Sequence, residues 1–205
     1  MLQRPPDSCL DAADPALCAL DVTRGTVRML LRHDLVAMAE VPLDGGRRAD
    51  LMAIDSRGNI VIIEIKVSRA DLLSDSKWTD YLGCCDRFYW AIPAGFDARP
   101  LDGEAFLPAR TGVIVADRYD AAIVREAHSE PLPAATRKRN TLAFARRAGR
   151  RLIGLIDPDA GALLSTRIRS LEFRARDGAP RFFRGIGEQL CHRRRSRIID
   201  RIVAG

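Results

Sequence analysis

The sequence has few of the residues on which several common kinds of site depend. It contains three histidines, none with a partner at the spacing of metal ligands, which argues against zinc binding and imidazole catalysis. The five cysteines are odd in number and show no CxxC spacing, so we expect reduced thiols rather than disulfides or a zinc site. The Gly-rich step Asp44-Gly45-Gly46 is typical of a turn and carries no nucleotide-binding fingerprint.

Long hydrophobic segments are also missing. No apolar stretch reaches the roughly 18 residues of a membrane-spanning helix, so we expect no membrane association. The start, residues 1–7, lacks a charged region followed by a long apolar one, so we expect no secretory signal. With 47% hydrophobic residues, a chain of 205 suffices for one well-packed domain with an appendage, or for two small ones. Together with the reduced thiols, these features predict a cytoplasmic protein.

The charge is unevenly distributed. Residues 136–205 hold 18 basic and 6 acidic residues, a balance of +12, whereas residues 1–135 hold 15 and 21, a balance of −6. Only three of the 33 basic residues are lysine, namely Lys66, Lys77 and Lys138. A basic C-terminal third beside an acidic front half suits phosphate binding next to an acidic metal site. A solvated basic tail is the alternative interpretation.

The hydrophobic pattern predicts an α/β sandwich, with helices before and after a mixed sheet. Helices are expected over residues 21–33, 69–85 and 134–152, and strands over 35–43, 49–55, 60–68, 87–92, 111–116 and 121–125. The domain is expected to span residues 21–156. Residues 1–20 are expected to form a flexible leader. Residues 157–205 form a basic extension whose order the sequence leaves open.

Two opposite charges interrupt the most apolar run of the chain. Residues 60–67 are apolar except for Glu64 and Lys66, and such a strand is normally buried on both faces. Unpaired buried charges cost roughly several kcal/mol, so they persist only where something compensates them. A divalent metal beside an anionic substrate compensates both charges. A metal-dependent nuclease is therefore the leading hypothesis.

The turn before this run determines what lies next to Glu64. A three-residue loop over residues 56–58 pairs Asp55 with Asn59 and places Asp50 directly opposite Glu64 on the same face. A loop of two or four residues would move Asp50 to the other face. The expected acidic pair therefore depends on the register of this hairpin.

Two further residues are predicted to lie near the pair. Lys66 shares the face of Glu64 because it is two residues further along the strand. A three-residue loop over residues 44–46 would bring Glu40 opposite Asp50 as a candidate third acid. An ordinary edge-strand carboxylate is the alternative interpretation of Glu40.

Asp followed about a dozen residues later by Glu-x-Lys, on adjacent strands, resembles the pattern of the PD-(D/E)xK nuclease superfamily, with Ala49 at the proline position. The predicted order of helix, three strands, helix and strand resembles the αβββαβ core of the restriction-endonuclease-like fold. Over roughly residues 22–152 the chain resembles the bacterial MmcB-like DNA repair family. The segments that carry this resemblance are residues 47–51, 61–66, 75–81, 85–91 and 111–117. It implies a nuclease-type fold and a role in DNA repair, and hydrolysis less firmly.

The resemblance implies a catalytic site in which Asp50 and Glu64 hold one or two Mg²⁺ (or Mn²⁺) ions, with the Ile65 carbonyl and Glu40 as further ligands. The metal would polarise the scissile phosphate and lower the pKa of a bound water. Lys66 would orient or deprotonate that water, or stabilise the developing charge. A buried salt-bridge cluster without activity is the alternative.

Lys77 and Tyr81 are four residues apart on the helix expected over residues 69–85, so they should share a face. The resemblance implies that Lys77 holds the phosphate and Tyr81 orients a metal-bound water, and an ordinary helix surface is the alternative. Other basic residues are predicted to contact DNA phosphates, which give affinity without sequence reading. They are Arg47, Arg48, Arg137, Lys138, Arg139, Arg146 and Arg147, with Arg150 and Arg151 on the same helix and Arg193 to Arg195 as weaker candidates.

We therefore expect a DNA repair nuclease whose partners are DNA and repair proteins, with no membrane partner. Two other functions stay open. One is a catalytically inactive protein of the same fold that binds DNA or acts as a scaffold. The other is an RNA-processing nuclease, because the core does not distinguish the sugar.

Overall fold

The computed structural model describes residues 17–43 and 45–160. The chain divides into two units, Met1–Leu152 and Ile153–Gly205, and of the second only residues 153–160 are described. The helices and strands are α1 (Ala19–Arg32), β1 (Leu35–Pro42), β2 (Arg48–Asp55), β3 (Ile60–Ile65), α2 (Arg69–Ser74), η1 (Trp78–Gly83), β4 (Arg87–Pro93), η2 (Arg99–Asp102), η3 (Glu104–Phe106), β5 (Gly112–Ala116), β6 (Ala121–Arg125) and α3 (Ala134–Ile156).

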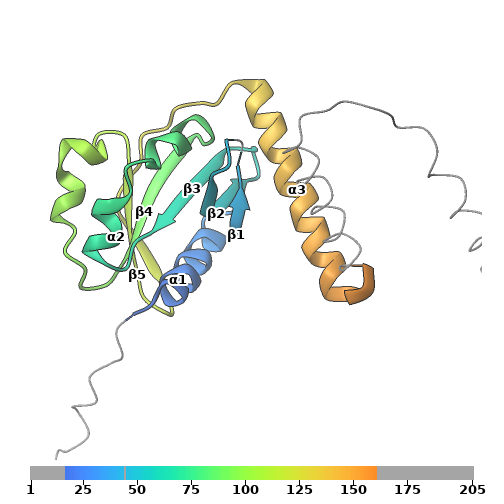
Figure 1. The fold of residues 1–205 in the computed structure, drawn as a ribbon, viewed down its shortest axis with the longest axis horizontal. Helices are drawn as coiled ribbons and strands as arrows, with labels where there is room; N and C mark the ends of the chain where they lie inside the picture. Colours follow the sequence, from blue (N-terminus) through green and yellow to red (C-terminus); the bar gives the residue numbers. More distant parts are fainter. Residues whose placement is uncertain (1–16, 44, 161–205) are drawn as a thin grey trace, which may run out of the picture. The chain divides into compact units, whose positions relative to one another are not determined.

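The six strands form one mixed sheet in the order in which they occur along the chain (Figure 1). β1, β2 and β3 are antiparallel neighbours, β3, β4 and β5 are parallel, and β6 returns antiparallel to β5. The predicted α/β fold class is confirmed. The order α1-β1-β2-β3-α2-β4 is that of the expected restriction-endonuclease-like core.

Each face of the sheet carries its own hydrophobic core. On one face α1 buries Val22 and Met29 against Val61, Ile63 and the neighbouring strands. The other face is covered by α2, η1 and the segments after β4, and its core contains a cluster of aromatic side chains. The aromatic residues of this second core are Trp78, Tyr81, Phe88, Trp90 and Phe106.

Gly25 allows α1 to lie directly against the β5–β6 turn. A Cβ atom at this position would lie 2.1 Å from the carbonyl oxygen of Asp117 and 2.4 Å from that of Asp120. Since backbone carbonyls cannot move aside easily, Gly25→Ala should destabilise the protein by roughly 1–3 kcal/mol, as overpacking does. Gly149 in α3 is the matched control, because a Cβ there meets nothing within 4 Å. Gly149→Ala should stabilise by about 0.5–1 kcal/mol in urea unfolding, and equal effects of the two changes would contradict this packing.

The helix expected over residues 69–85 is wrong in its extent. α2 ends at Ser74, Asp75 adopts φ −81° and ψ 84°, and η1 is a 3-10 helix. The carboxylate of Asp75 explains the break. It accepts hydrogen bonds from the backbone N–H of Lys77 at 3.3 Å and from the side chain of Lys66 at 2.8 Å. An Asp side chain that bonds nearby backbone groups competes with the helical hydrogen bonds.

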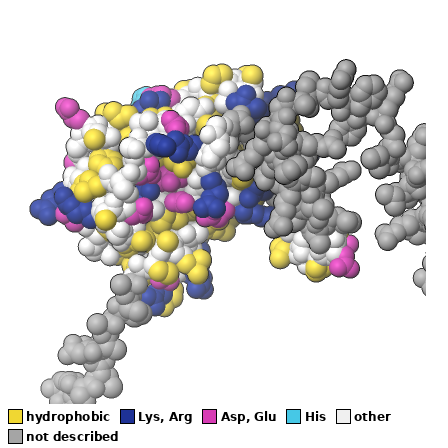
Figure 2. All heavy atoms as spheres, viewed as in Figure 1, with side chains coloured by type: hydrophobic (Ala, Val, Ile, Leu, Met, Phe, Trp, Pro, Cys, Tyr) yellow, Lys and Arg dark blue, Asp and Glu magenta, His cyan; other side chains and the backbone are white. Residues whose placement is uncertain are grey.

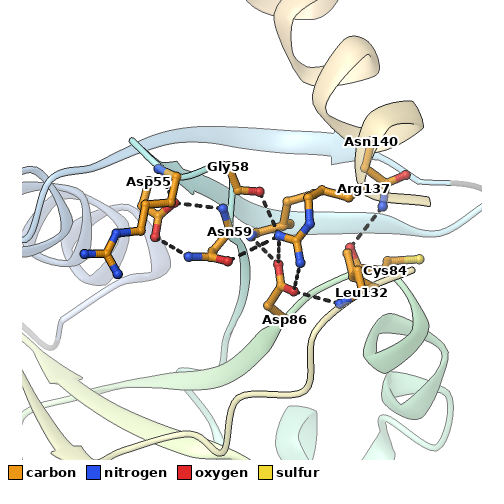
Figure 3. A network of polar contacts seen from close by, with 10 residues as sticks. Asp55, Gly58, Asn59, Cys84, Asp86, Leu132, Arg137 and Asn140 are labelled. Carbon is orange, nitrogen blue, oxygen red and sulfur yellow. Dashed lines mark hydrogen bonds and ion pairs between the residues drawn. The ribbon is translucent and has the colours of Figure 1, made fainter. Parts of the chain in front are cut away.

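A buried ion pair fixes the first turn of α3 to the sheet (Figure 3). Arg137 donates to both oxygens of Asp86, at 2.8 and 2.6 Å, and also to the carbonyl oxygen of Gly58 at 2.9 Å. Asp86 is 3% exposed and accepts two backbone N–H groups as well, from Ile60 at 2.7 Å and Leu132 at 2.8 Å. A single carboxylate thus joins β3, the segment before α3, and α3 itself.

Other boundaries differ little from the prediction. α1 begins two residues early, β3 ends at Ile65 because Ser68 already caps α2, and α3 continues to Ile156. The flexible leader is described only from residue 17, and the basic extension only to residue 160, so Arg193 to Arg195 lie outside the described residues. None of the described helices combines the length and the apolar character needed to traverse a bilayer.

Candidate active site

The hairpin between β2 and β3 has the register on which the acidic pair depends. Leu51 lies opposite Ile63. The loop has three residues, since the N–H of Asp55 donates to the carbonyl oxygen of Asn59 at 3.2 Å. Gly58 in this loop has φ +80°, a conformation that favours glycine. The predicted position of Asp50 opposite Glu64 is therefore confirmed.

Beyond Leu51 and Ile63 the backbone hydrogen bonds between β2 and β3 end, and two side-chain carboxylates accept the next backbone N–H groups. The N–H of Asp50 donates to Oε1 of Glu64 at 3.2 Å, and the N–H of Ile65 donates to Oδ2 of Asp50 at 2.8 Å. Each acid therefore accepts one backbone N–H from the opposite strand. The two carboxylates lie next to each other where the strands are joined by side chains instead of backbone groups. We call Asp50 and Glu64 the acidic pair.

Burial outweighs the opposing charge of Lys66 at both members of the acidic pair. Glu64 is 4% exposed. Burial and the adjacent charge of Asp50 raise its pKa to about 8, against the opposing effects of the Asp50 N–H and Lys66. Burial also raises the pKa of Asp50, with Glu40 contributing. Among the described residues, no Lys or Arg forms an ion pair with either carboxylate.

Lys66 is paired with acids of α2 and its C-terminal cap instead. Its ammonium lies 2.8 Å from Oδ2 of Asp75, 3.8 Å from Oδ1 of Asp71 and 5.9 Å from the ring centroid of Trp90. Burial alone would lower the pKa of Lys66, but the hydrogen bond and charge of Asp75 outweigh it and raise the pKa. Lys66 therefore stays protonated at neutral pH. It is placed to stabilise negative charge, and its alternative role as the base stays a prediction.

Glu40 lies near Asp50, and its carboxylate is paired with Arg48. The register of β1 and β2 places it opposite Asp50, as predicted, because Ala39 pairs with Leu51 and Val41 with Ala49. Its backbone has φ +57°, and its carboxylate lies 2.6 Å from Nε of Arg48. In the described part of the chain, no three His, Cys, Asp or Glu side chains are grouped so that they could hold a metal. The predicted role of Glu40 as a further metal ligand stays a prediction.

Lys77 and Tyr81 do not share the face of an α-helix, because Lys77 is the N-cap residue of η1 and Tyr81 lies within this 3-10 helix. Lys77 precedes η1 and is exposed, whereas Tyr81 is buried in the aromatic core. The hydroxyl of Tyr81 donates to the carbonyl oxygen of Arg48 at 3.1 Å. Burial and the charges of Glu64, Asp75 and Asp50 raise its pKa, so the hydroxyl stays protonated.

The basic residues predicted to bind DNA fall into two groups. One group contacts the protein itself: Arg47 donates twice to Asp80, Arg48 pairs with Glu40, and Arg137 donates four hydrogen bonds, so it has a structural role beside its predicted one. Lys138, Arg139 and Arg146 are exposed on α3, and Arg147 is half-buried. Figure 2 shows basic and acidic side chains interspersed on the face in view.

The residues of the acidic pair fit a hard divalent cation. The two carboxylates have raised pKa values and no ion-pair partner among the described residues. They lie next to the backbone of Ile65 and supply only oxygen donors. A cation would offset the negative charge that burial makes unfavourable. The Ile65 carbonyl remains a predicted ligand.

The raised pKa of Glu64 has a consequence for stability. Because the folded-state pKa is about 8 and the reference value is 4.5, the folded protein binds the proton more tightly than the unfolded chain. In EDTA, stability should therefore fall as the pH rises from about 4.5 through about 8, by up to about 1.4 kcal/mol per pH unit. Urea unfolding of the wild type and Glu64→Gln over this range measures it. The variant should lose this part of the slope, the exposed Glu104→Gln should keep it, and parallel curves for all three would contradict a buried Glu64.

Sequence reasoning missed the partners of Lys66 and the pair of Asp86 with Arg137. The signal for the first was local: Asp75 precedes Ser76 in a segment of weak helix formers, where an Asp side chain favours a turn. The second pair joins residues far apart in the sequence, so no local pattern reveals it.

The fold and the acidic pair define an α/β protein with a restriction-endonuclease-like core. The model of the family described as "DNA repair protein MmcB-like" matches residues 7–159, most of the chain, so the protein belongs to the MmcB-like DNA repair protein family. The match begins well before residue 22, where the resemblance was expected to start. Membership supports a role in DNA repair.

The chain is also similar to a solved structure, the SPO1766 protein of unknown function from Silicibacter pomeroyi. The two are 42% identical, with a TM-score of 0.62, over 67% of this chain and 90% of that chain. No curated protein matches the chain.

Proposed function

We propose that the protein is a metal-dependent nuclease that hydrolyses phosphodiester bonds of DNA during repair. The observation that carries this proposal is the acidic pair: two adjacent, raised-pKa carboxylates on neighbouring strands, with no ion-pair partner among the described residues. A purely structural pair of this kind is costly, because buried charges need compensation. Family membership supplies DNA repair as the setting.

In this proposal Asp50 and Glu64 hold Mg²⁺ or Mn²⁺, with the carbonyl of Ile65 as a further ligand. The cation supplies a Lewis acid and a water of lowered pKa. Lys66, which stays protonated, stabilises negative charge on the phosphate. Tyr81 fixes the backbone of Arg48 at the start of β2, so its contribution is to position the strand that carries Asp50.

The DNA backbone is proposed to be held by basic side chains outside the acidic pair. Lys138, Arg139 and Arg146 are exposed on α3, and Lys77 is exposed near the start of η1. Contacts of this kind bind phosphates and carry no sequence information. Cys18, Cys84 and Cys85 form no disulfide with one another, consistent with action in the reducing cytoplasm.

A second candidate function is DNA binding without catalysis. The observation in its favour is the ion pair of Lys66 with Asp75 at 2.8 Å, which directs the ammonium to an acid outside the acidic pair. In that case Lys66 stabilises the fold and the site has lost its chemistry.

Incubation of the purified protein with branched and crosslinked DNA, in Mg²⁺, in Mn²⁺ and in EDTA, tests the proposal. We expect metal-dependent cutting that EDTA stops. Binding without cutting in every metal would establish the second function instead. Matched RNA substrates in the same assay should be cut more slowly, and preferential cutting of RNA would identify an RNA-processing nuclease.

A further inference from the structure

Arginine side chains from β2 and α3 surround a single carboxylate at the edge of the sheet. Arg48 pairs with Glu40 at 2.6 Å, and Nη2 of Arg151 donates to the carbonyl oxygen of Ala39 at 2.6 Å. Arg147, also on α3, is within electrostatic reach of Arg48, Arg151 and Glu40. Figure 1 shows α3 running beside β1, the strand that carries Glu40. We call Arg48, Arg147 and Arg151 the arginine cluster.

The guanidinium group of Arg147 has one buried N–H donor for which the surrounding described residues offer no acceptor. Its Nε atom is buried and has no hydrogen-bond partner within residues 17–43 and 45–160. Burial lowers the pKa of Arg147, and the charges of Arg151 and Arg150 lower it further, while Glu40 opposes them. A buried, unpaired guanidinium N–H beside like charges is unfavourable, and native proteins keep such groups where a ligand supplies the missing acceptor.

Among the described residues, Glu40 is the acid whose charge acts most on Arg147, and it has an unusual backbone conformation. Its φ of +57° lies in the left-handed region, which non-glycine residues seldom adopt. Such a conformation persists where surrounding contacts stabilise it, and it concentrates at functional sites. The carboxylate of Glu40 forms an ion pair with Arg48 and acts electrostatically on Arg147. Two guanidinium groups therefore face one carboxylate, which leaves one positive charge in excess.

We infer that the arginine cluster is a binding site for one DNA backbone phosphate, next to the acidic pair, and that Glu40 occupies this site in the free protein. The inference rests on the proposed function only in naming DNA as the ligand. A phosphate oxygen supplies the acceptor that Nε of Arg147 lacks. Guanidinium groups bind phosphate through paired N–H donors, more strongly than through neutral hydrogen bonds. The phosphate competes with Glu40 for the same donors and displaces it.

The position of the cluster places this phosphate close to the acidic pair. Glu40 lies opposite Asp50 in the strand register, and its charge contributes to the raised pKa of Asp50. The phosphate held by the cluster is thus a neighbour of the one presented to the acidic pair. DNA binding would also exchange the carboxylate of Glu40 for a phosphate at this edge of the sheet.

Binding of a 20-base-pair DNA duplex in EDTA, followed by fluorescence anisotropy at several salt concentrations, tests the inference without metal or cleavage. Glu40→Gln removes the competitor and should tighten binding about fivefold. Arg147→Ala should weaken binding about tenfold and lower the salt slope by about one phosphate contact. In the Arg147→Ala background the gain from Glu40→Gln should disappear, which a general charge effect would not do.

Controls separate this site from overall charge and from folding. Asp102→Asn removes one negative charge from an exposed ion pair with Arg125 and should leave affinity within about twofold. Arg151→Ala is the second variant at the cluster. Because its side chain is exposed, this substitution should disturb folding less than Arg147→Ala. Unchanged binding in Glu40→Gln, or the same gain with and without Arg147, would overturn the inference. A protein that shows the expected binding and never cuts DNA would leave it standing and overturn only the nuclease proposal.

Discussion

Glu64→Gln is expected to lower the rate of metal-dependent DNA cleavage by at least about 10³-fold. The change is nearly isosteric, and the amide oxygen can still accept the N–H of Asp50, so the hairpin is preserved. The amide removes the negative charge that the acidic pair needs for a divalent cation. In metal-free protein at pH 8 the variant should unfold at a higher urea concentration than the wild type, because it no longer carries a buried charge. Gel-based cleavage and urea unfolding of the same preparations measure both effects.

Three comparisons make this result specific. Asp50→Asn should cause a similar loss, and the double variant should lose no more than either single one, because the two acids act on one cation. Lys66→Met should lower the rate about 10²-fold, since it removes a charge from the site and not a cation ligand. Asp102→Asn, far from the pair in an exposed ion pair, should cut normally. A Glu64→Gln protein that is stable and still cuts at the wild-type rate would remove the acidic pair from the mechanism.

Arg137→Ala is expected to destabilise the fold by about 3–5 kcal/mol, although the residue is basic and lies on a helix. The change leaves the carboxylate of Asp86, which is 3% exposed, without its counter-ion and with two backbone N–H groups as its remaining partners. It also removes the hydrogen bonds to Gly58 and Asn59 that tie α3 to the β2–β3 loop. The midpoint of urea unfolding, with the slope checked for two-state behaviour, measures the loss.

Arg146→Ala is the matched control, because its side chain is exposed on the same helix. Its effect should stay within about 0.5 kcal/mol. Asp86→Asn combined with Arg137→Ala should be less destabilising than the sum of the single changes, since no charge is then left buried. A loss below about 1 kcal/mol in Arg137→Ala would show that this ion pair does not fix α3.

The acidic pair was predictable because its geometry depends on local rules. The apolar run over residues 60–67 specified a buried strand, and the three-residue loop specified the register that places Asp50 opposite Glu64. Counting along two strands joined by a short loop requires no knowledge of the rest of the fold. The fold class followed from the order of helical and strand patterns in the same way.

The surroundings of the pair were not predictable, because they depend on contacts between distant segments. Lys66 was expected to face the acids, but a break in the following helix offers Asp75 as its partner. Glu40 has the predicted register, yet its side chain forms an ion pair with Arg48 of β2 and lies within electrostatic reach of Arg147 of α3. In the sequence Arg137 is one more basic residue of α3, and only the fold shows that Asp86 is its ion-pair partner. In each case the tertiary structure determines which side chain becomes the partner of the residue.

Calorimetric titration of Mn²⁺ into the metal-free protein tests the central claim most directly, since it asks whether the acidic pair holds a cation before any chemistry. We predict binding to the wild type that becomes tighter as the pH rises towards about 8, because the proton on Glu64 must leave when the metal binds. Binding should be lost in Glu64→Gln and in Asp50→Asn. Absence of binding to the wild type, or equal binding to the wild type and both variants, would contradict a metal site at Asp50 and Glu64.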